Sequence, residues 1–130
     1  MDYAALSVRI RAAPFHQWLE LELESANADG VILGMKWRDE LVSRADPPIM
    51  HGGIVAALID VAGLYAVLAA GGAVRSTAYL HVDYHKSVPP GPVKVKSKVI
   101  RIGRTLSVAD TVLYGATPAP LASGRGGYVA

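Results

Sequence analysis

Two hydrophobic periodicities divide this chain into its expected elements. Residues 18–25 (WLELELES) alternate leucine with glutamate, which is typical of a strand with one face on the core and the other in water. Residues 50–70 (MHGGIVAALIDVAGLYAVLAA) are apolar at helical spacing and contain a single carboxylate, Asp60. The pattern therefore predicts a half-buried sheet and one buried helix.

Turn residues separate further alternating segments on both sides of this helix. A turn at 27–30 (NADG) and a returning strand at 31–37 make a hairpin with the first strand. DPP at 46–48 stops the chain before the long helix, and Gly71 and Gly72 end it. Four more strands follow, at residues 77–88, 93–102, 106–115 and 121–130.

Near the N-terminus, Tyr3, Leu6 and Ile10 predict a short amphipathic helix that Pro14 ends. The expected order is thus short helix, two strands, long helix and four strands. An antiparallel sheet wrapped around one central helix, an α+β architecture, explains why the long helix has no polar face.

Composition narrows the class of protein. The 130 residues are 52% hydrophobic and 18% charged, which predicts a single globular domain over residues 1–130. There is no cysteine, so disulfide and thiol chemistry are excluded, and a net charge of +2 is too small for a nucleic-acid-binding protein. The first fifteen residues lack the apolar run of a secretory signal, so a cytoplasmic location is expected.

The long apolar run approaches the length of a membrane span, but a carboxylate at mid-span is costly in lipid, so a core helix is expected instead. At helical spacing it carries two stripes. The bulky stripe is Ile54, Leu58, Val61, Tyr65 and Leu68, and the mostly small one is Gly53, Ala56, Asp60, Gly63 and Val67. Small residues permit a close approach, so we expect Asp60 on the face where another backbone comes near.

The start of this helix has the chemistry of an oxyanion hole. The N–H groups of a first turn have no partner within the helix, and the positive end of the helix dipole lies there. The N–H of Gly52 or Gly53 can therefore polarise a carbonyl, an effect worth roughly 3–4 kcal/mol per donor. Alternatively, the glycine pair only permits a sharp entry into the helix.

The motif HGGIVAALIDVAGLYA, in which His51-Gly52-Gly53 is followed by Asp60, is similar to that of the phenylacetate-pathway (PaaI-type) acyl-CoA thioesterases. The order of elements resembles their hotdog fold over nearly the whole chain. The resemblance implies hydrolysis of an acyl-CoA thioester by a homodimer or homotetramer. It implies no cofactor, since coenzyme A is part of the substrate. Two alternatives stay open: a hotdog module that binds acyl-CoA without hydrolysis, and a dehydratase or hydratase of the same fold.

The resemblance also implies roles for particular residues. Asp60 would activate a water or attack the thioester itself, whereas the alternative is a buried acid satisfied by a backbone group. Thr77 matches a Ser or Thr that orients the water in similar enzymes. His51 is expected to hold the loop or touch the thioester. Where relatives often carry an Asn or Gln that contacts the carbonyl, this chain has Ala45.

Helix geometry predicts that the active site is shared between chains. Gly52 and Asp60 are separated by about 12 Å along one helix, at 1.5 Å per residue. A general base must act within about 3 Å of the attacking water. We therefore expect one chain to supply the oxyanion donor and another chain to supply Asp60 and Thr77, in a homo-oligomer.

Three other groups of polar side chains stand out in the sequence. By the same resemblance, Lys86, Arg101 and Arg104 are candidates for binding the phosphates of coenzyme A. The lysines at 94, 96 and 98 are expected to form a solvated face opposite the glutamates at 20, 22 and 24. The side chains at 81, 83 and 85 (His, Asp, His) have a spacing that can chelate a metal, but they are more simply a polar outer face, so no metal site is expected.

Overall fold

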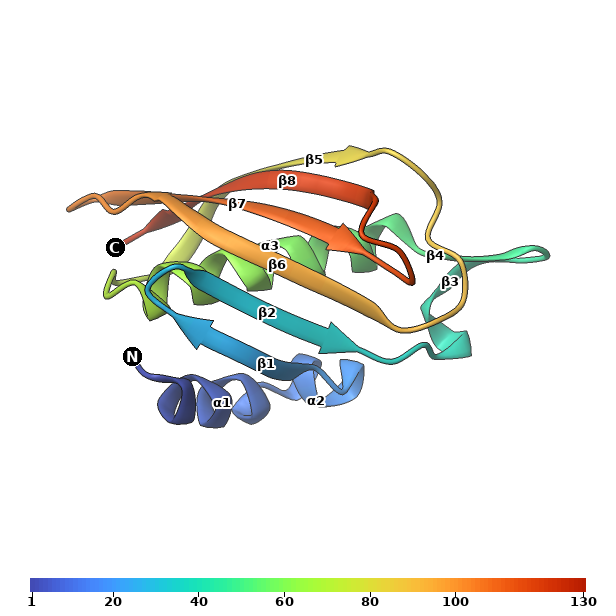
Figure 1. Cartoon of the computed structure of the whole chain (residues 1–130), viewed down its shortest axis with the longest axis horizontal. Coiled ribbons are helices and arrows are strands. Elements are labelled where there is room, and N and C mark those ends of the chain that lie inside the picture. The colour runs from blue at the N-terminus through green and yellow to red at the C-terminus, as the bar shows by residue number, and fades with distance from the viewer.

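A long helix, α3 (Gly52–Ala69), lies across one face of a six-stranded antiparallel sheet in the computed structural model, which describes residues 1–130 (Figure 1). The sheet order is β1-β2-β6-β7-β8-β5. Its strands are β1 (Glu22–Asn27), β2 (Gly30–Met35), β5 (Ser76–Tyr84), β6 (Val93–Arg101), β7 (Leu106–Tyr114) and β8 (Pro120–Val129). The predicted antiparallel sheet around one central helix is confirmed.

The N-terminal segment forms two consecutive helices where the sequence predicts one. Helix α1 (Tyr3–Ala12) is capped by Asp2, whose carboxylate accepts from the N–H of Ala5 across 2.9 Å. A second helix, α2 (Pro14–Leu19), begins at the proline that was expected to end the first. A proline fits the first turn of a helix because its missing N–H would have no partner there.

This second helix shortens the first predicted strand. Glu20 caps α2 in a left-handed conformation, with φ of 55°, and β1 begins only at Glu22 rather than at residue 18. The leucines at 19, 21 and 23 are nevertheless all buried. The alternating pattern thus identified the buried side chains correctly, although part of the segment is helical.

A small hairpin that the sequence analysis missed precedes α3. It consists of β3 (Val42–Ala45) and β4 (Pro48–Met50), after a short 3-10 turn η1 (Asp39–Leu41), and Asp46 and Pro47 form its tip. The N–H of Met50 donates to the carbonyl of Val88, and that of His51 donates to the carbonyl of Leu41 across 2.7 Å. These two bonds fix the point at which the chain enters α3.

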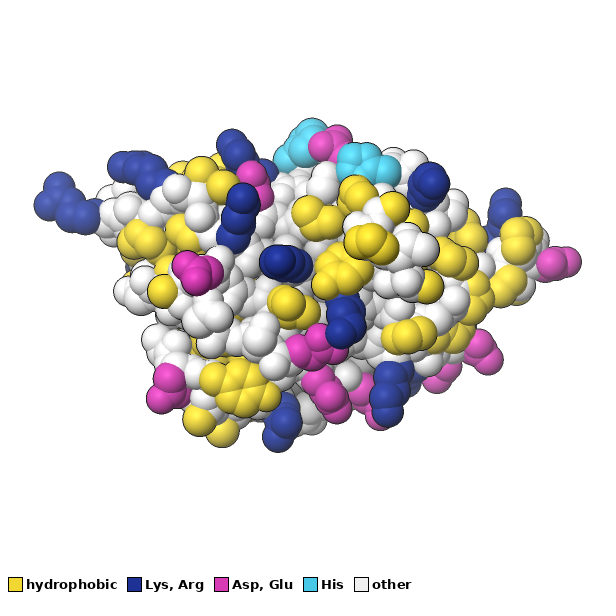
Figure 2. Space-filling model, viewed as in Figure 1, with side chains coloured by type: hydrophobic (Ala, Val, Ile, Leu, Met, Phe, Trp, Pro, Cys, Tyr) yellow, Lys and Arg dark blue, Asp and Glu magenta, His cyan; other side chains and the backbone are white.

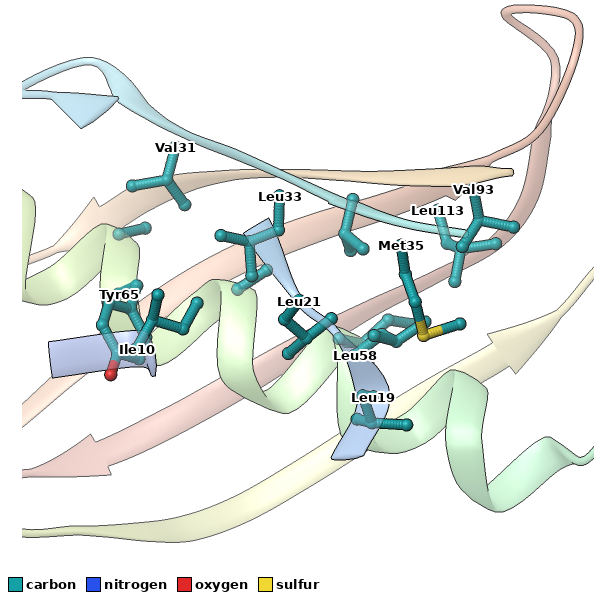
Figure 3. Close-up of a cluster of buried hydrophobic side chains, with 14 of the residues drawn as sticks. Ile10, Leu19, Leu21, Val31, Leu33, Met35, Leu58, Tyr65, Val93 and Leu113 are labelled. Atoms are coloured by element: carbon teal, nitrogen blue, oxygen red, sulfur yellow. The ribbon is translucent and has the colours of Figure 1, made fainter. Parts of the chain in front are cut away.

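The hydrophobic core fills the space between the sheet and α3. Figure 3 shows side chains from β2, β6 and β7 meeting Leu58 and Tyr65 of the helix, with Ile10 of α1 closing one side. Leu33, Leu58, Val95 and Leu113 are completely inaccessible to solvent. The mean hydropathy of α3 is 2.0 over its 18 residues, which would suffice for a membrane span, but here it is the core helix of the domain.

One face of α3 stays partly open, and it differs from the predicted small stripe. Gly63 and Val67 are buried, because Gly63 packs directly against the Tyr128 hydroxyl of β8 and has no room for a Cβ. Among the partly exposed residues of the helix, Ala57, Asp60, Val61 and Leu64 lie on one side of it, together with the exposed Gly53. We call these five residues the open face of α3. Asp60 is on it, as expected, but Gly63 is not.

The two edges of the sheet are unequal. Helix α1 packs against the edge strand β1, as Figure 1 shows. At the other edge, none of the nine residues of β5 is fully buried, although Leu80 and Val82 pack against the core. An edge strand of this kind presents unpaired backbone groups on its outer side.

Candidate active site

The first turn of α3 is capped by His51. Its Nδ1 atom accepts a hydrogen bond from the N–H of Gly53 across 2.8 Å, which satisfies one of the unpaired donors of the helix. This contact requires a glycine at position 53, because a Cβ there would lie only 2.9 Å from the ring nitrogen. His51 therefore holds the loop, which is one of the two roles expected for it.

This cap distinguishes the two predicted oxyanion donors. The N–H of Gly53 is taken by His51, whereas Gly52 is the first residue of α3 and its N–H has no partner within the helix. The carbonyl of Gly52 accepts from the hydroxyl of Tyr84 across 2.7 Å. Of the pair, Gly52 is therefore the residue whose N–H is available to a ligand.

A cleft of about 490 Å³ lies beside Gly52. Tyr84 and Lys86 line it from the end of β5 and the following loop, and Ser43 lines it from β3. Apolar side chains at 49, 50, 55 and 88 complete the wall. The cleft thus combines a helix N-terminus, one lysine and an apolar lining, which suits an anionic ligand with an apolar part.

Asp60 and Thr77 are brought together as the sequence analysis expected. The hydroxyl of Thr77 donates to Oδ1 of Asp60 across 2.8 Å, from the start of β5 to the middle of α3. It is the single hydrogen bond that the Asp60 carboxylate accepts within the chain. The second carboxylate oxygen, on the open face of α3, is left for another partner.

Behind Asp60 the helix is tied to the sheet by Tyr128. This fully buried side chain donates its hydroxyl to the backbone carbonyl of Asp60 across 2.9 Å. Burial, and secondarily the negative charge of Asp60, raise the pKa of Tyr128 above its ordinary value, so the hydroxyl stays protonated and donates. This hydrogen bond therefore ties the backbone of Asp60 to β8, in addition to the packing of the helix on the sheet.

The two halves of the expected site are separate within one chain. Asp60 and Thr77 do not line the cleft beside Gly52. Arg101 ends β6 and Arg104 lies in the β6–β7 turn, at the end of the sheet opposite to Lys86 and the start of α3 (Figure 1). One chain thus holds an oxyanion-type half with Lys86 and an acid half with Asp60 and Thr77.

His81 of β5 and His85, the residue that follows this strand, engage separate partners on the outer face of the sheet. Nε2 of His81 lies 3.0 Å from an oxygen of Asp83, while His85 bonds to Ser123 across 2.8 Å. All three side chains of the HVDYH segment are exposed and do not converge on a point. They form a polar outer surface, as the simpler interpretation predicted.

The lysine row on β6 also belongs to this solvated outer face. Lys94 pairs with Glu24 at 3.0 Å, which confirms the expected opposition of lysines and glutamates for this pair. Nearby, Arg125 and Asp110 form a bidentate pair. Figure 2 shows basic and acidic side chains interspersed over this face rather than gathered by sign. Ala45, where relatives often have an amide, ends β3 in the exposed hairpin.

Sequence reasoning missed Tyr84 and Tyr128. Both were expected at inward positions of predicted strands, where an aromatic residue is usually a core side chain. Tyr128 is buried as expected, whereas Tyr84 lies at the end of its strand and is 55% exposed. The partner of Tyr84 is 32 residues away in the chain and that of Tyr128 is 68 residues away, so no local spacing indicates either contact.

Known proteins share this fold. The E. coli PaaI protein from the phenylacetic acid degradation operon has the same fold, with a TM-score of 0.82 at 19% identity over 97% of this chain and 94% of that one. The family model described as the thioesterase superfamily matches residues 48–119. This chain has the hotdog fold, and it belongs to the thioesterase superfamily.

Two further relatives extend this similarity. A solved structure of a thioesterase-superfamily protein is 36% identical to this chain, with a TM-score of 0.89. The match covers 95% of this chain and 94% of that protein's chain. A protein of Saccharolobus solfataricus provisionally named as an esterase is 24% identical over 101 residues, 77% of this chain and 71% of its own. Together they support a hydrolase of acyl thioesters in general.

Proposed function

We propose that this protein hydrolyses acyl-CoA thioesters to the free acid and coenzyme A. The observation that carries the proposal is the Asp60–Thr77 pair, a carboxylate on the open face of an otherwise apolar helix, with one oxygen held at 2.8 Å. An acid in such a place costs free energy unless it is used or satisfied, and only one of its two oxygens accepts a hydrogen bond within the chain.

In the proposed reaction, the free oxygen of Asp60 accepts a proton from a water while the water oxygen bonds to the thioester carbonyl carbon. The carbonyl oxygen gains negative charge, which the N–H of Gly52 and the helix dipole stabilise. The C–S bond then breaks, and the thiolate of coenzyme A takes up the proton. In the variant mechanism, a carboxylate oxygen of Asp60 attacks the carbonyl carbon and the C–S bond breaks, so that coenzyme A leaves as a thiolate and an anhydride forms. Water then hydrolyses the anhydride to the free acid and the Asp60 carboxylate, and the thiolate takes up the proton that is released. Neither route needs a cofactor.

The proposed active enzyme is a homodimer, with tetramers as pairs of dimers. Its two sites would each combine the Gly52 end of one helix with Asp60 and Thr77 of the other chain. The separation of the two halves within one chain supports this arrangement, as does the uncovered edge strand β5.

An antiparallel pairing of two β5 edges would place opposite ends of the two chains side by side. Lys86 of one chain would then share an end of the assembly with Arg101 and Arg104 of the other. We propose these three residues as the anchors for the phosphates of coenzyme A, because fixed cations at one end of a composite site suit a nucleotide phosphate.

The test is a panel of acyl-CoA substrates from acetyl through long chains to phenylacetyl and benzoyl, with free thiol as the readout. We expect thiol release on at least one of them. Tight binding with no thiol release on any substrate would instead identify a binding module. Addition of water to a crotonyl-type substrate would identify a hydratase.

A further inference from the structure

The peptide group that joins Gly52 to Gly53 is held at both of its polar ends. Its carbonyl oxygen accepts from the Tyr84 hydroxyl across 2.7 Å, and its N–H donates to His51 Nδ1 across 2.8 Å. The preceding residue is also fixed, because the N–H of His51 donates to the carbonyl of Leu41 across 2.7 Å. Three hydrogen bonds thus surround one glycine pair.

Such anchoring matters because glycine is the most flexible residue of the backbone. Two successive glycines at a helix start have no side chains to restrict the orientation of their peptide planes. The Gly52 N–H belongs to the preceding peptide, whose His51 carbonyl accepts from the N–H groups of Ile54 and Val55, so the helix sets the plane of that peptide. Groups outside the helix determine where Gly52 is held beside the cleft. His51 restrains the pair from within the loop, and Tyr84 restrains it from a different element, the end of β5.

We propose that Tyr84 is a positioning residue that holds Gly52, and with it the Gly52 N–H, in place beside the cleft. It acts through Gly52 and touches no reacting atom, and the inference rests on the proposed function for its effect on turnover. Fixing a donor before reaction is what makes an oxyanion hole effective, since no reorganisation is then needed as charge develops. The bond to Tyr84 also polarises the peptide that donates to His51, so the two bonds strengthen each other.

The ring of Tyr84 has a second effect on the same glycine. A Cβ placed on Gly52 would meet three atoms of the Tyr84 side chain at 3.4–3.5 Å, so the ring lies directly beside this residue and forms a wall of the cleft. The hydroxyl sets the peptide plane, while the ring limits the space next to it. A phenylalanine retains the ring and removes only the hydroxyl.

Tyr79, on the same strand, supplies a matched control. Its ring lies against Gly127 and is 44% exposed, and its hydroxyl makes no hydrogen bond within the chain. The Tyr84→Phe variant should lower kcat by about 10-fold through misalignment of the Gly52 donor. Its KM should stay within about twofold, because ground-state binding is not removed. The Tyr79→Phe variant should retain wild-type values of both constants.

A wild-type kcat in Tyr84→Phe would overturn the assignment. So would a loss that resides mainly in KM, since it would make Tyr84 a substrate contact instead.

A second readout does not depend on thioesterase activity. Amide hydrogen exchange, followed by NMR, should show faster exchange at Gly53 in Tyr84→Phe and no change in Tyr79→Phe, because the peptide loses one of its two restraints. If the wild-type protein released no thiol from any acyl-CoA, the proposed function would fail, but the exchange measurement would still test whether Tyr84 restrains the Gly52–Gly53 peptide. Unchanged exchange at Gly53 in Tyr84→Phe would refute this role of Tyr84.

Discussion

Thr77 Oγ1 lies 2.8 Å from Oδ1 of Asp60, so the first strand after α3 orients the only acid in that helix. A side chain restrained in this way presents its second oxygen in a fixed direction. Replacing Asp60 with asparagine should leave the fold intact, because the amide oxygen can still accept from Thr77. The lost basicity should lower turnover by about 10²-fold or more. The measurement is thiol release by Asp60→Asn, with the surface variant Asp83→Asn as the control. Thermal melting of both variants checks that the fold is intact.

Thr77 itself should matter through its hydroxyl. Thr77→Val keeps the shape of the side chain but leaves the Asp60 carboxylate without its internal donor, so we expect turnover to fall by about 10-fold. Thr77→Ser retains the hydroxyl and should stay within about threefold of wild type. Equal rates for the two variants would show that the hydrogen bond has no part in the reaction.

Gly52→Ala should separate activity from stability. The new Cβ would make ordinary contacts of 3.4 Å with Tyr84, so the chain has room for it, and alanine favours a helix by about 1 kcal/mol over glycine. The melting temperature should therefore not fall, while turnover should drop by about 10²-fold because the methyl group occupies the approach to the donor. Gly115→Ala, whose Cβ also meets its neighbour at 3.4 Å, is the control and should stay active.

Shared sites can be tested by mixing inactive chains. Asp60→Ala and Gly52→Val subunits are refolded together, after each has been shown to fold and dimerise alone. In each mixed dimer one site keeps both groups, so random pairing should restore about a quarter of wild-type activity. If mixing restores nothing, each chain holds a complete site and the two-chain arrangement is wrong.

The contact between Tyr128 and Gly63 should be measurable as an interaction energy. Tyr128→Phe removes a buried hydrogen bond to Asp60 and should cost about 1 kcal/mol of unfolding free energy. Gly63→Ala places a methyl group against the hydroxyl and should cost about 1–3 kcal/mol by overpacking. The double variant should lose less than the sum, because the nearest clashing atom is gone. Urea denaturation of the four proteins completes the cycle, and strict additivity would contradict the contact.

Most of the fold could be predicted because each of these elements has a recognisable pattern in its own segment of the sequence. Strands β6, β7 and β8 follow alternating segments bounded by glycine and proline, and α3 follows an apolar run that Gly71 terminates with φ of 91°. The secondary structure of residues 14–21 could not be predicted in this way. Its leucine alternation satisfies a strand, yet Pro14 starts a helical turn and Glu20 closes it in a conformation that a sequence pattern does not reveal.

The candidate site was only partly predictable, because some of its contacts join residues that are far apart in the sequence. His51, Gly52 and Asp60 belong to one helix, so their relation follows from helical geometry, and Thr77 came from a resemblance. The placement of β8 between β7 and β5 decides where Tyr128 and Thr77 stand, and strand order depends on the packing of the whole sheet. The contact of Tyr84 with Gly52 arises in the same way and could not be predicted from spacing.

The cap at the start of α3 also determines where a proton resides. Because Nδ1 of His51 accepts from Gly53, the neutral ring must carry its hydrogen on Nε2. The imidazole therefore offers a donor, and not a base, to whatever lies beyond the end of the helix. An asparagine could replace the cap, since its oxygen also accepts from such an N–H, but it would present its amide group with a different reach. The identity of this residue thus fixes a tautomer as well as a turn.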